Sequence, residues 1–495
     1  MSAPSGKHVL VLGLGESGLA MAQWCVRNGA AVRVADTRAE PPHLGELRRR
    51  VPGADFRPGA FDKPLLDGID LVALSPGLSG GLMVVIHARA AGIPVVGEIE
   101  LFAQGLRDLG VRQAISPLKK PAGPPQGFLG PLGGERREAA FSGGAQVIAI
   151  TGTNGKTTTT ALTGHLIATT GRRVGVAGNI SPSLLAALMV CQDEEKLPEA
   201  WVLELSSFQL ETLETLDADA AAVLNVSDDH LDRYIDVDDY DAAKARIFMG
   251  NGVQVLNRQD ARVKRMAIPG RRLVTFGLDA PGDEADFGLR LSSRNGRDEP
   301  WIVQGDRFLL PVRELPISGL HNAANAMAAL ALCEAIGLPA DGLLPALRGF
   351  CGLPHRVERI AEIGGVAYYD DSKGTNVAAT VAALQGMGRK VVVILGGEGK
   401  GQDFSPLKEA VARHARAAVL IGRDGPAIGA ALDGCGVPVE PAIDLAEAVQ
   451  KSAVAARRGD AVLLSPACAS FDMFRNYEHR AEVFADAVRR LEAGA

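Results

Sequence analysis

Residues 147–158 contain a glycine-bearing motif whose residue types and spacing could bind phosphate groups. An apolar run, Val147 to Ile150, leads into a short loop that carries a lysine. Backbone N–H groups of such a loop hold nucleotide phosphates, a lysine reaches the terminal phosphate, and a threonine hydroxyl ligates Mg²⁺. The predicted nucleotide-binding residues are Gly152, Thr153, Asn154, Gly155, Lys156, Thr157 and Thr158. The loop is shorter than the general phosphate-binding loop, and an unliganded strand-to-helix turn is the alternative.

Acidic and histidine side chains follow two other apolar runs of the same part of the chain. Glu204 ends the run 200–204, and Asp228, Asp229 and His230 follow the run 220–224. The carboxyl ends of parallel strands meet at one sheet edge, so Glu204 and His230 are predicted to reach nucleotide-bound Mg²⁺ together. Taken singly, each would more often be structural. Lys244 lies on a predicted helix, 240–248, where a solvated lysine is the ordinary expectation.

Two amides stand one turn apart at the start of an alanine-rich helix. Asn322 and Asn325 share a helix face, where they could bind a nucleotide or cap the helix.

The last third of the chain places polar residues after three further strands. Asp371, Lys373 and Thr375 follow the first, Lys400 the second, and Ser470 the third. Such a set is typical of a site for an anionic substrate and a nucleotide. Cys468 has no histidine near it in sequence and is predicted to serve packing rather than act as a nucleophile.

The first 80 residues carry a second glycine turn. Gly13, Gly15 and Gly18 match G-x-G-x-x-G after a strand, and Asp36 lies 21 residues after Gly15. This pattern is typical of a dinucleotide site, but a nucleotide-like substrate or a purely structural turn fits it as well. A later strand ends in Ser75-Pro-Gly77, another turn with open backbone N–H groups.

Three α/β blocks are needed to position these residues. The chain has 495 residues, about three domains at ~150 residues each, and strands alternate with helices throughout. We predict a Rossmann-like first domain, a central domain with a parallel sheet of the phosphate-loop ATPase type, and a Rossmann-like C-terminal domain. The predicted bounds are 1–110, 146–352 and 353–495, with a Pro- and Gly-rich linker or insertion at 111–145.

Composition excludes several classes of protein. A net charge of −6 argues against a general nucleic-acid surface, and no apolar run reaches the ~18 residues of a membrane span. The six cysteines lack metal or disulfide spacing, and the N-terminus shows no secretory pattern. We expect a cytoplasmic protein that acts as a monomer.

Several longer strings resemble those of one enzyme family. The short phosphate loop is similar to that of the Mur ligases and folylpolyglutamate synthetases, which form amide bonds at the expense of ATP. The strings at 178–180, 204–210, 229–234, 353–356, 371–376 and 465–470 resemble the Mur ligases that add D-glutamate, and they occur in the family's order. The insertion at 111–145 is the main departure, and it puts the relative placement of the first two domains in doubt.

The resemblance implies a role for each matching position. It implies catalytic roles for Lys156, Glu204, His230 and Lys244, and two Mg²⁺ ions held by Thr157, Glu204, His230 and a carbamylated Lys244. It implies that ATP is bound by the phosphate loop with Asn322, Asn325, Arg356, Asp371 and Lys373, and D-glutamate by Thr375, Lys400, Ser470 and Tyr477. It implies that UDP-N-acetylmuramoyl-L-alanine is bound by Gly15, Glu16, Ser17, Asp36, Thr37, Arg38, Ser75, Pro76, Gly77, Asn179, Ser206 and Gln209. Tyr477 stands where the family often has Phe.

The implied reaction is ATP-driven amide formation through an acyl phosphate, in the synthesis of peptidoglycan. A ligase that extends folate would leave the first domain without a role, and a diaminopimelate-adding ligase should carry an Asp-Asn-Pro-Arg string, which this chain lacks. The alternatives from other classes are a nicotinamide-dependent oxidoreductase built on the Gly13–Gly18 turn and a nucleotide-driven switch without catalysis.

Overall fold

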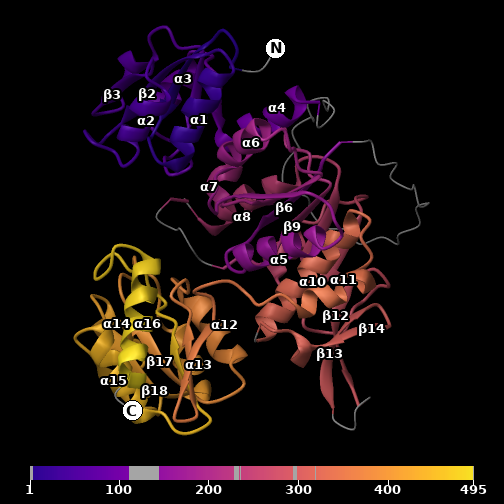
Figure 1. Ribbon diagram of the computed structural model, residues 1–495, viewed down its shortest axis with the longest axis vertical. Coiled ribbons are helices and arrows are strands. Elements are labelled where there is room, and N and C mark those ends of the chain that lie inside the picture. Colours follow the sequence, from indigo (N-terminus) through magenta and orange to yellow (C-terminus); the bar gives the residue numbers. More distant parts are fainter. Residues whose placement is uncertain are drawn as a thin grey trace.

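The computed structural model describes residues 4–110, 144–227, 233–234, 236–293, 298–317 and 319–493. Three α/β bodies follow one another along the chain, each built on its own sheet (Figure 1). The predicted three-domain α/β architecture is confirmed. Most strands of each sheet are parallel and buried on both faces, which explains their nearly continuous Val, Leu, Ile and Ala content.

The first sheet has the strand order β3-β2-β1-β4-β5 and is parallel throughout. Its strands are β1 (His8–Leu12), β2 (Ala31–Asp36), β3 (Asp55–Pro58), β4 (Leu71–Leu74) and β5 (Val95–Gly97). Its helices are α1 (Glu16–Arg27), α2 (Leu44–Arg50), α3 (Met83–Ala90) and α4 (Glu98–Asp108), with a 3₁₀ turn at Lys63–Leu66. The strand order reverses between β1 and β4, so the turns that follow these two strands flank the switch point where open α/β sheets bind ligands.

The central sheet has the order β14-β13-β12-β11-β10-β9-β6-β8-β7. Its strands are β6 (Gln146–Thr151), β7 (Val174–Gly178), β8 (Ala200–Glu204), β9 (Ala220–Val223), β10 (Val253–Asn257), β11 (Leu273–Phe276), β12 (Phe287–Ser292), β13 (Glu299–Gln304) and β14 (Arg307–Pro311). Its helices are α5 (Lys156–Ala168), α6 (Leu184–Asp193), α7 (Ser207–Leu210), α8 (Val237–Ala245), α9 (Ala261–Arg265), α10 (Leu320–Ala335) and α11 (Ala340–Arg348). Because β6 pairs in parallel with both β8 and β9, the ends of these three strands lie side by side.

The third sheet has the order β15-β16-β20-β17-β18-β19, with only β15 antiparallel to its neighbour. Its strands are β15 (Glu358–Ile363), β16 (Val366–Asp370), β17 (Val391–Gly396), β18 (Ala415–Ile421), β19 (Val439–Pro441) and β20 (Ala461–Leu464). Its helices are α12 (Val377–Gly386), α13 (Pro406–His414), α14 (Gly425–Ala431), α15 (Leu445–Ala455) and α16 (Tyr477–Ala493). The three loops that carry the predicted substrate residues follow β16, β17 and β20, which are adjacent strands.

The first and central domains share one hydrophobic core. Trp24 of α1 and Phe102 of α4 belong to the same buried cluster as Leu188 of α6 and Trp201 of β8, and the rings of Phe102 and Trp201 lie 5.1 Å apart, edge to face. Nearly all of the predicted insertion lies outside the described residues. The shared core shows that these two domains are held together by packing, whatever the insertion does.

Among the helices of the described residues, none is long and apolar enough to cross a membrane.

Candidate active site

The phosphate loop has the conformation that its glycines predict. Gly155 has φ +80°, and a Cβ built there would lie 2.5 Å from Oδ1 of Asn325. A side chain at position 155 would therefore strain the backbone and collide with α10. Lys156 begins α5, and its Nζ donates to the carbonyls of Gly152 and Thr153, both at 2.8 Å. The loop thus carries a concentrated positive charge at a helix N-terminus, a favourable setting for phosphate.

Asn225, which the sequence reasoning did not select, braces this loop. Its Oδ1 accepts from the backbone N–H of Asn154 at 2.8 Å, and its Nδ2 donates to the carbonyl of the same residue at 3.0 Å. Its own carbonyl accepts from the N–H of Thr153 at 2.9 Å. Asn225 follows β9 by two residues, so its place after an apolar run was the signal that could have identified it.

Glu204 has the features of a cation ligand. It ends β8 and is only 2% exposed, and its Oε1 accepts from Nδ2 of Asn179 at 3.0 Å. Its Oε2 is buried and has no hydrogen-bond partner among the described residues. A buried carboxylate oxygen without a partner is costly unless a cation or donor meets it, so this carboxylate fits Mg²⁺ beside the phosphate loop. His230, the second predicted ligand, lies outside the described residues.

Lys244 is buried, contrary to the ordinary expectation of a solvated helix lysine. It is 1% exposed on α8, and its Nζ donates to the carbonyl of Gly152 at 3.0 Å and lies 4.4 Å from the centre of the Tyr240 ring. The amine therefore lies directly beneath the phosphate loop. The predicted helix itself is confirmed, with its last residues in a 3₁₀ turn, Arg246–Phe248.

A cavity of 420 Å³ opens between the central and C-terminal domains beside the phosphate loop. Its lining includes Asn154, Gly155, Thr158, Asn322, Asn325, Arg356, Asp371 and Lys373, all of which were predicted to bind ATP. Asn325 donates to Oδ1 of Asn322 at 3.1 Å, and both amides are buried. The alternative of helix-start capping is wrong, because Gly319 is the N-cap of α10 and no side chain among the described residues caps it. Asn325 instead limits the space over Gly155, and the contact of the pair with a nucleotide stays a prediction.

The C-terminal domain reaches the phosphate loop through two side chains. Nη2 of Arg356 donates to Oγ1 of Thr157 at 2.6 Å, and Nδ2 of Asn376 donates to Oδ1 of Asn154 at 3.1 Å. Burial lowers the pKa of Arg356, while the nearby carboxylates of Glu204 and Asp371 act in the opposite sense. A guanidinium therefore lies between the loop and the two acidic groups.

Asp371 and Lys373 are close to this guanidinium. Burial raises the pKa of Asp371 to about 7, although its Oδ2 accepts from Oγ of Ser465 at 2.6 Å. Burial and the charge of Arg356 lower the pKa of Lys373 to about 8, and its Nζ lies 3.7 Å from the centre of the Tyr477 ring. Both groups therefore titrate near neutral pH, as groups in active sites often do.

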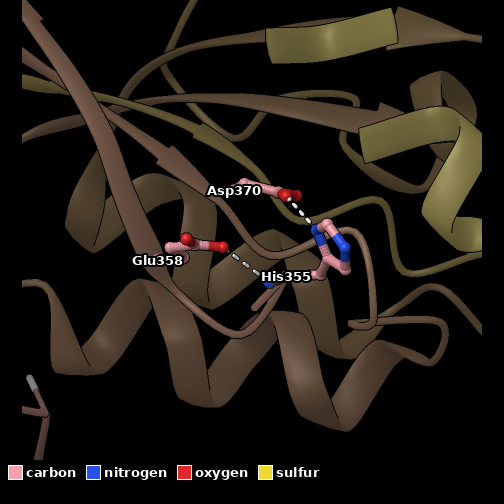
Figure 2. Close-up of side chains that lie close together, drawn as sticks. All are labelled: His355, Glu358 and Asp370. Atoms are coloured by element: carbon pink, nitrogen blue, oxygen red, sulfur yellow. Dashed lines mark hydrogen bonds and ion pairs between the residues drawn. The ribbon is translucent and has the colours of Figure 1, made fainter. Parts of the chain in front are cut away.

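A hydrogen-bonded turn holds Arg356 in place. Nδ1 of His355 lies 2.7 Å from Oδ2 of Asp370, and the N–H of His355 donates to Oε2 of Glu358 at 2.9 Å (Figure 2). His355 and Val357 have φ of +63° and +50°, so both neighbours of Arg356 are left-handed. The two carboxylates and the ring thus support an unfavourable backbone that points Arg356 at the loop.

Three of the four predicted D-glutamate residues, Thr375, Lys400 and Ser470, come from three loops that the structure joins, and the fourth, Tyr477, begins α16. The loop of Lys400 after β17 pairs with the loop of Ser470 after β20 through a bridge between Glu398 and Ala469. Arg480 of α16 is fully buried and donates to the carbonyls of Ser372 and Cys468 at 2.8 and 3.1 Å. Arg480 thereby ties the loop after β16, which bears Thr375, to the loop after β20. The sequence reasoning missed it, because a charged helix residue ordinarily faces solvent.

Cys468 is fully buried, and burial raises the pKa of its thiol to about 12. These features agree with its predicted packing role.

The first domain forms an open turn at the switch point of its sheet. Asp36 is buried, accepts from the N–H of Leu14 at 2.8 Å and forms two side-chain bonds with Arg38, which hold its pKa near 2. A Cβ added at Gly15 or Gly77 would have no atom within 4 Å. These two glycines border open space that a ligand could enter, so their predicted role in binding the UDP end of the substrate is sterically sound.

Some predicted substrate residues are occupied by contacts within the protein. Glu16 accepts from Oγ of Ser181 and the N–H of Ser183 across the interface with the central domain, and Ser17 donates to the buried Glu98 at 2.5 Å. Ser206 and Gln209 form a capping box at the start of α7. Their substrate contacts stay predictions, and they require these side chains to share their polar atoms with a ligand.

Comparison with known proteins agrees with this geometry along the whole chain. The MurD-like N-terminal domain of Mur ligases matches residues 7–97, the Mur ligase middle domain matches 150–333, and the glutamate ligase domain of Mur ligases matches 355–468. The crystal structure of UDP-N-acetylmuramate-alanine ligase from Thermotoga maritima aligns with a TM-score of 0.56 at 18% identity, over 99% of this chain and 100% of that chain, and so shares the fold. The chain belongs to the Mur ligase family, and it is an enzyme of the ligase class.

Curated relatives narrow the position of the chain within this family. It is 55% identical over 494 residues to the UDP-N-acetylmuramoylalanine--D-glutamate ligase of Aromatoleum aromaticum, with 99% of both chains covered. It is 52% identical to the ligase of the same name from Nitrosospira multiformis, over 99% of this chain and 96% of that protein. The resemblance predicted from sequence, to the members that add D-glutamate, is therefore confirmed.

Proposed function

We propose that this enzyme joins D-glutamate to UDP-N-acetylmuramoyl-L-alanine with hydrolysis of ATP, a step of peptidoglycan synthesis. The observation that carries the proposal is the hydrogen bond from Arg356 of the C-terminal domain to Thr157 of the phosphate loop. Arg356 also lines the cavity beside this loop, and the carboxylate of Glu204 is near enough to raise its pKa against the effect of burial. Phosphoryl transfer needs this kind of arrangement, because positive groups must surround the phosphate while an anionic acceptor approaches.

The proposed reaction passes through an acyl phosphate, because a carboxylate does not condense with an amine at neutral pH. The carboxylate of the L-alanyl group attacks the γ-phosphorus of ATP, and ADP leaves. The amine of D-glutamate then attacks the acyl carbon, loses a proton, and displaces inorganic phosphate from a tetrahedral intermediate. Lys156 and Arg356 stabilise the negative charge that accumulates on the transferred group.

The residues that would hold two Mg²⁺ ions are Thr157, Glu204, His230 and a carbamylated Lys244. Oε2 of Glu204, which has no hydrogen-bond partner among the described residues, supports one site, and Asn179 orients this carboxylate through Oε1. The amine of Lys244, 3.0 Å from the carbonyl of Gly152, would place a carbamate next to the phosphate loop. When bound, the ions would supply Lewis acidity at the phosphate oxygens.

The two other substrates would enter from opposite domains. The turn around Gly15, with Asp36 and the loop 75–77, would hold the UDP end, and the loops after β16, β17 and β20 would hold D-glutamate. We propose that the reaction takes place in the cytoplasm and that the active enzyme is a monomer. All six cysteines are free, as a reducing compartment would keep them.

The test is phosphate release with ATP, Mg²⁺ and UDP-N-acetylmuramoyl-L-alanine, with amino acids added singly. We expect release with D-glutamate and none with L-glutamate, L-alanine or diaminopimelate. Release with a different amino acid would retain the ligase and change its acceptor. Nucleotide binding without amino-acid-dependent release would instead favour a switch, and tight nicotinamide binding would favour an oxidoreductase.

A further inference from the structure

Arg233 joins the first domain to the central domain through the loop that follows β4. Its Nη1 donates to the carbonyl of Pro76 at 3.0 Å, and its Nη2 donates to the carbonyl of Leu78 at 2.9 Å. These carbonyls belong to the loop after β4, which we define as the 75–78 loop. Arg233 itself belongs to the central domain, so both hydrogen bonds cross between the domains.

The same guanidinium also contacts residues of the central domain. Nε and Nη2 of Arg233 donate to the two carboxylate oxygens of Glu211 at 3.1 and 2.8 Å, and its Cζ lies 4.0 Å from the centre of the Phe208 ring. Tyr234 donates to the same carboxylate at 2.8 Å. The Arg233 side chain is only 13% exposed. The planar guanidinium has several N–H donors in fixed directions, so it can bond to Glu211 and to the two carbonyls at the same time. A lysine ammonium does not reproduce this arrangement.

The attachment points lie close in sequence to the predicted reaction centre. Glu211 immediately follows α7, which begins three residues after Glu204, and Arg233 follows the predicted metal ligand His230 by three positions. Residues 75–77 of this loop are the predicted contact for the UDP end of the substrate. One guanidinium therefore connects the loop predicted to anchor the substrate with Glu211, which lies seven residues beyond the predicted cation ligand Glu204 in sequence.

We propose that Arg233 is a positioning residue that sets the distance between the UDP-binding loop and the reacting end of the substrate. This inference rests on the proposed function. A ligand that contacts both domains gains affinity, because its second contact becomes intramolecular once the first is made. It loses this gain in affinity when the two sites are not held at the correct distance and orientation. Small misplacements of a reacting group also lower the rate of the chemical step. Arg233 should thus matter for a spanning substrate and not for UDP alone.

The experiment compares the binding of UDP and of UDP-N-acetylmuramoyl-L-alanine to wild-type protein and to Arg233→Lys by calorimetry. We expect UDP to bind the two proteins within about twofold, while the full compound binds the variant at least about tenfold more weakly. In steady-state assays, KM for the full compound should rise and KM for ATP should stay unchanged. The matched control is Arg107→Lys, because Arg107 of α4 also bonds across the two domains, to the carbonyl of Thr215 at 3.1 Å, away from the 75–78 loop. This control should bind both ligands as the wild type does.

Equal loss of UDP and of the full compound in Arg233→Lys would overturn the positioning role, because Arg233 would then shape the UDP site itself. No loss of either, or the same loss in Arg107→Lys, would also overturn it. If Arg233→Lys fails to fold, Glu211→Gln decides the question, since it removes the ionic partner and leaves the bonds to Pro76 and Leu78 in place. Glu211→Gln should then show the same selective loss of the full compound. Wild-type protein that binds neither ligand would overturn the proposed function and this inference together.

Discussion

Two charged residues of the candidate site are buried more deeply than charged side chains usually are. Glu204 and Lys244 are both almost wholly buried, yet a charged side chain of either type usually lies at the surface. Oε1 of Glu204 accepts from Nδ2 of Asn179, and Nζ of Lys244 donates to the carbonyl of Gly152. Burial of an ionisable group is costly for stability, and Oε2 of Glu204 has no hydrogen-bond partner among the described residues, which fits a carboxylate that binds a cation.

Lys244→Ala should lose phosphate release, and added formate or acetate should restore part of it. The physical reason is that a small carboxylate can occupy the space of the carbamate that the alanine variant lacks. The measurement is turnover with and without formate at roughly 100 mM, a concentration high enough for a weakly binding ligand. Lys156→Ala is the control, because it should fall by about 10²–10³-fold through loss of a charge on the phosphates and should not be rescued. A folded Lys244→Ala that no carboxylate rescues would count against the carbamate.

Asp371 should make the stability of the protein depend on pH in an unusual direction. Its pKa is raised from 3.8 to about 7 by burial, so the folded state holds its proton more tightly than the unfolded chain. Its stabilising contribution is full below about pH 4 and is lost as the pH rises to about 7, with a slope of up to about 1.4 kcal/mol per unit. Asp371→Asn should remove this contribution. The free energy of unfolding of both proteins, measured by denaturant titration across this range, should therefore diverge in slope, and parallel curves would contradict the assignment.

At the scale of elements, each sheet delivers its site loops at the carboxyl edge of parallel strands. The β1–α1 turn illustrates how closely such a loop is built. A Cβ at Gly18 would lie 1.9 Å from the carbonyl oxygen of Gly13, whereas a Cβ at Gly15 would have no atom within 4 Å. The two glycines of one motif therefore have different purposes: Gly18 permits close helix packing, and Gly15 leaves room above the turn.

Gly15→Ala and Gly18→Ala should separate ligand binding from folding. Gly15 has φ −89°, which alanine adopts without strain, so this variant should unfold at nearly the wild-type temperature while its KM for the UDP-linked substrate rises by about tenfold or more. Gly18→Ala should lower the unfolding temperature by several degrees, because the backbone of the turn must move. Thermal unfolding and steady-state kinetics check both. Unchanged KM in Gly15→Ala would mean that no ligand approaches this turn.

At the scale of the whole molecule, the two domain interfaces differ in kind. The first and central domains share an apolar core that includes Trp24, Phe102 and Trp201, whereas Arg356 and Asn376 connect the C-terminal domain to the phosphate loop by single polar bonds. The C-terminal domain also packs on the central domain where α12 meets α10, with Gly386 next to Gly319. The buried apolar clusters of these two domains are nevertheless separate among the described residues, so we expect this interface, and not the first, to open for substrate entry and close for reaction.

Deleting residues 118–140 should leave turnover within a few-fold of the wild type. The matched family regions end at residue 97 and resume at residue 150, so the segment lies outside the regions that define the family. The measurement is kcat and KM for all three substrates, with thermal unfolding as the test of folding. Complete loss of activity in a folded deletion variant would assign the segment a functional part.

The sequence by itself determined the three α/β blocks, the phosphate loop and the family, because strand periodicity, glycine spacing and motif order are local properties of the chain. It could not decide between the structural and functional readings of Asn325 and Lys244, because burial and partners depend on which elements pack together. The resemblance implied that Arg356 joins the phosphate loop at the nucleotide, but only the tertiary structure showed its bond to Thr157 and the bonds of Arg233 to the 75–78 loop, each across more than 150 residues of sequence. Contacts at such separations follow from the packing of whole domains, and no local pattern records them.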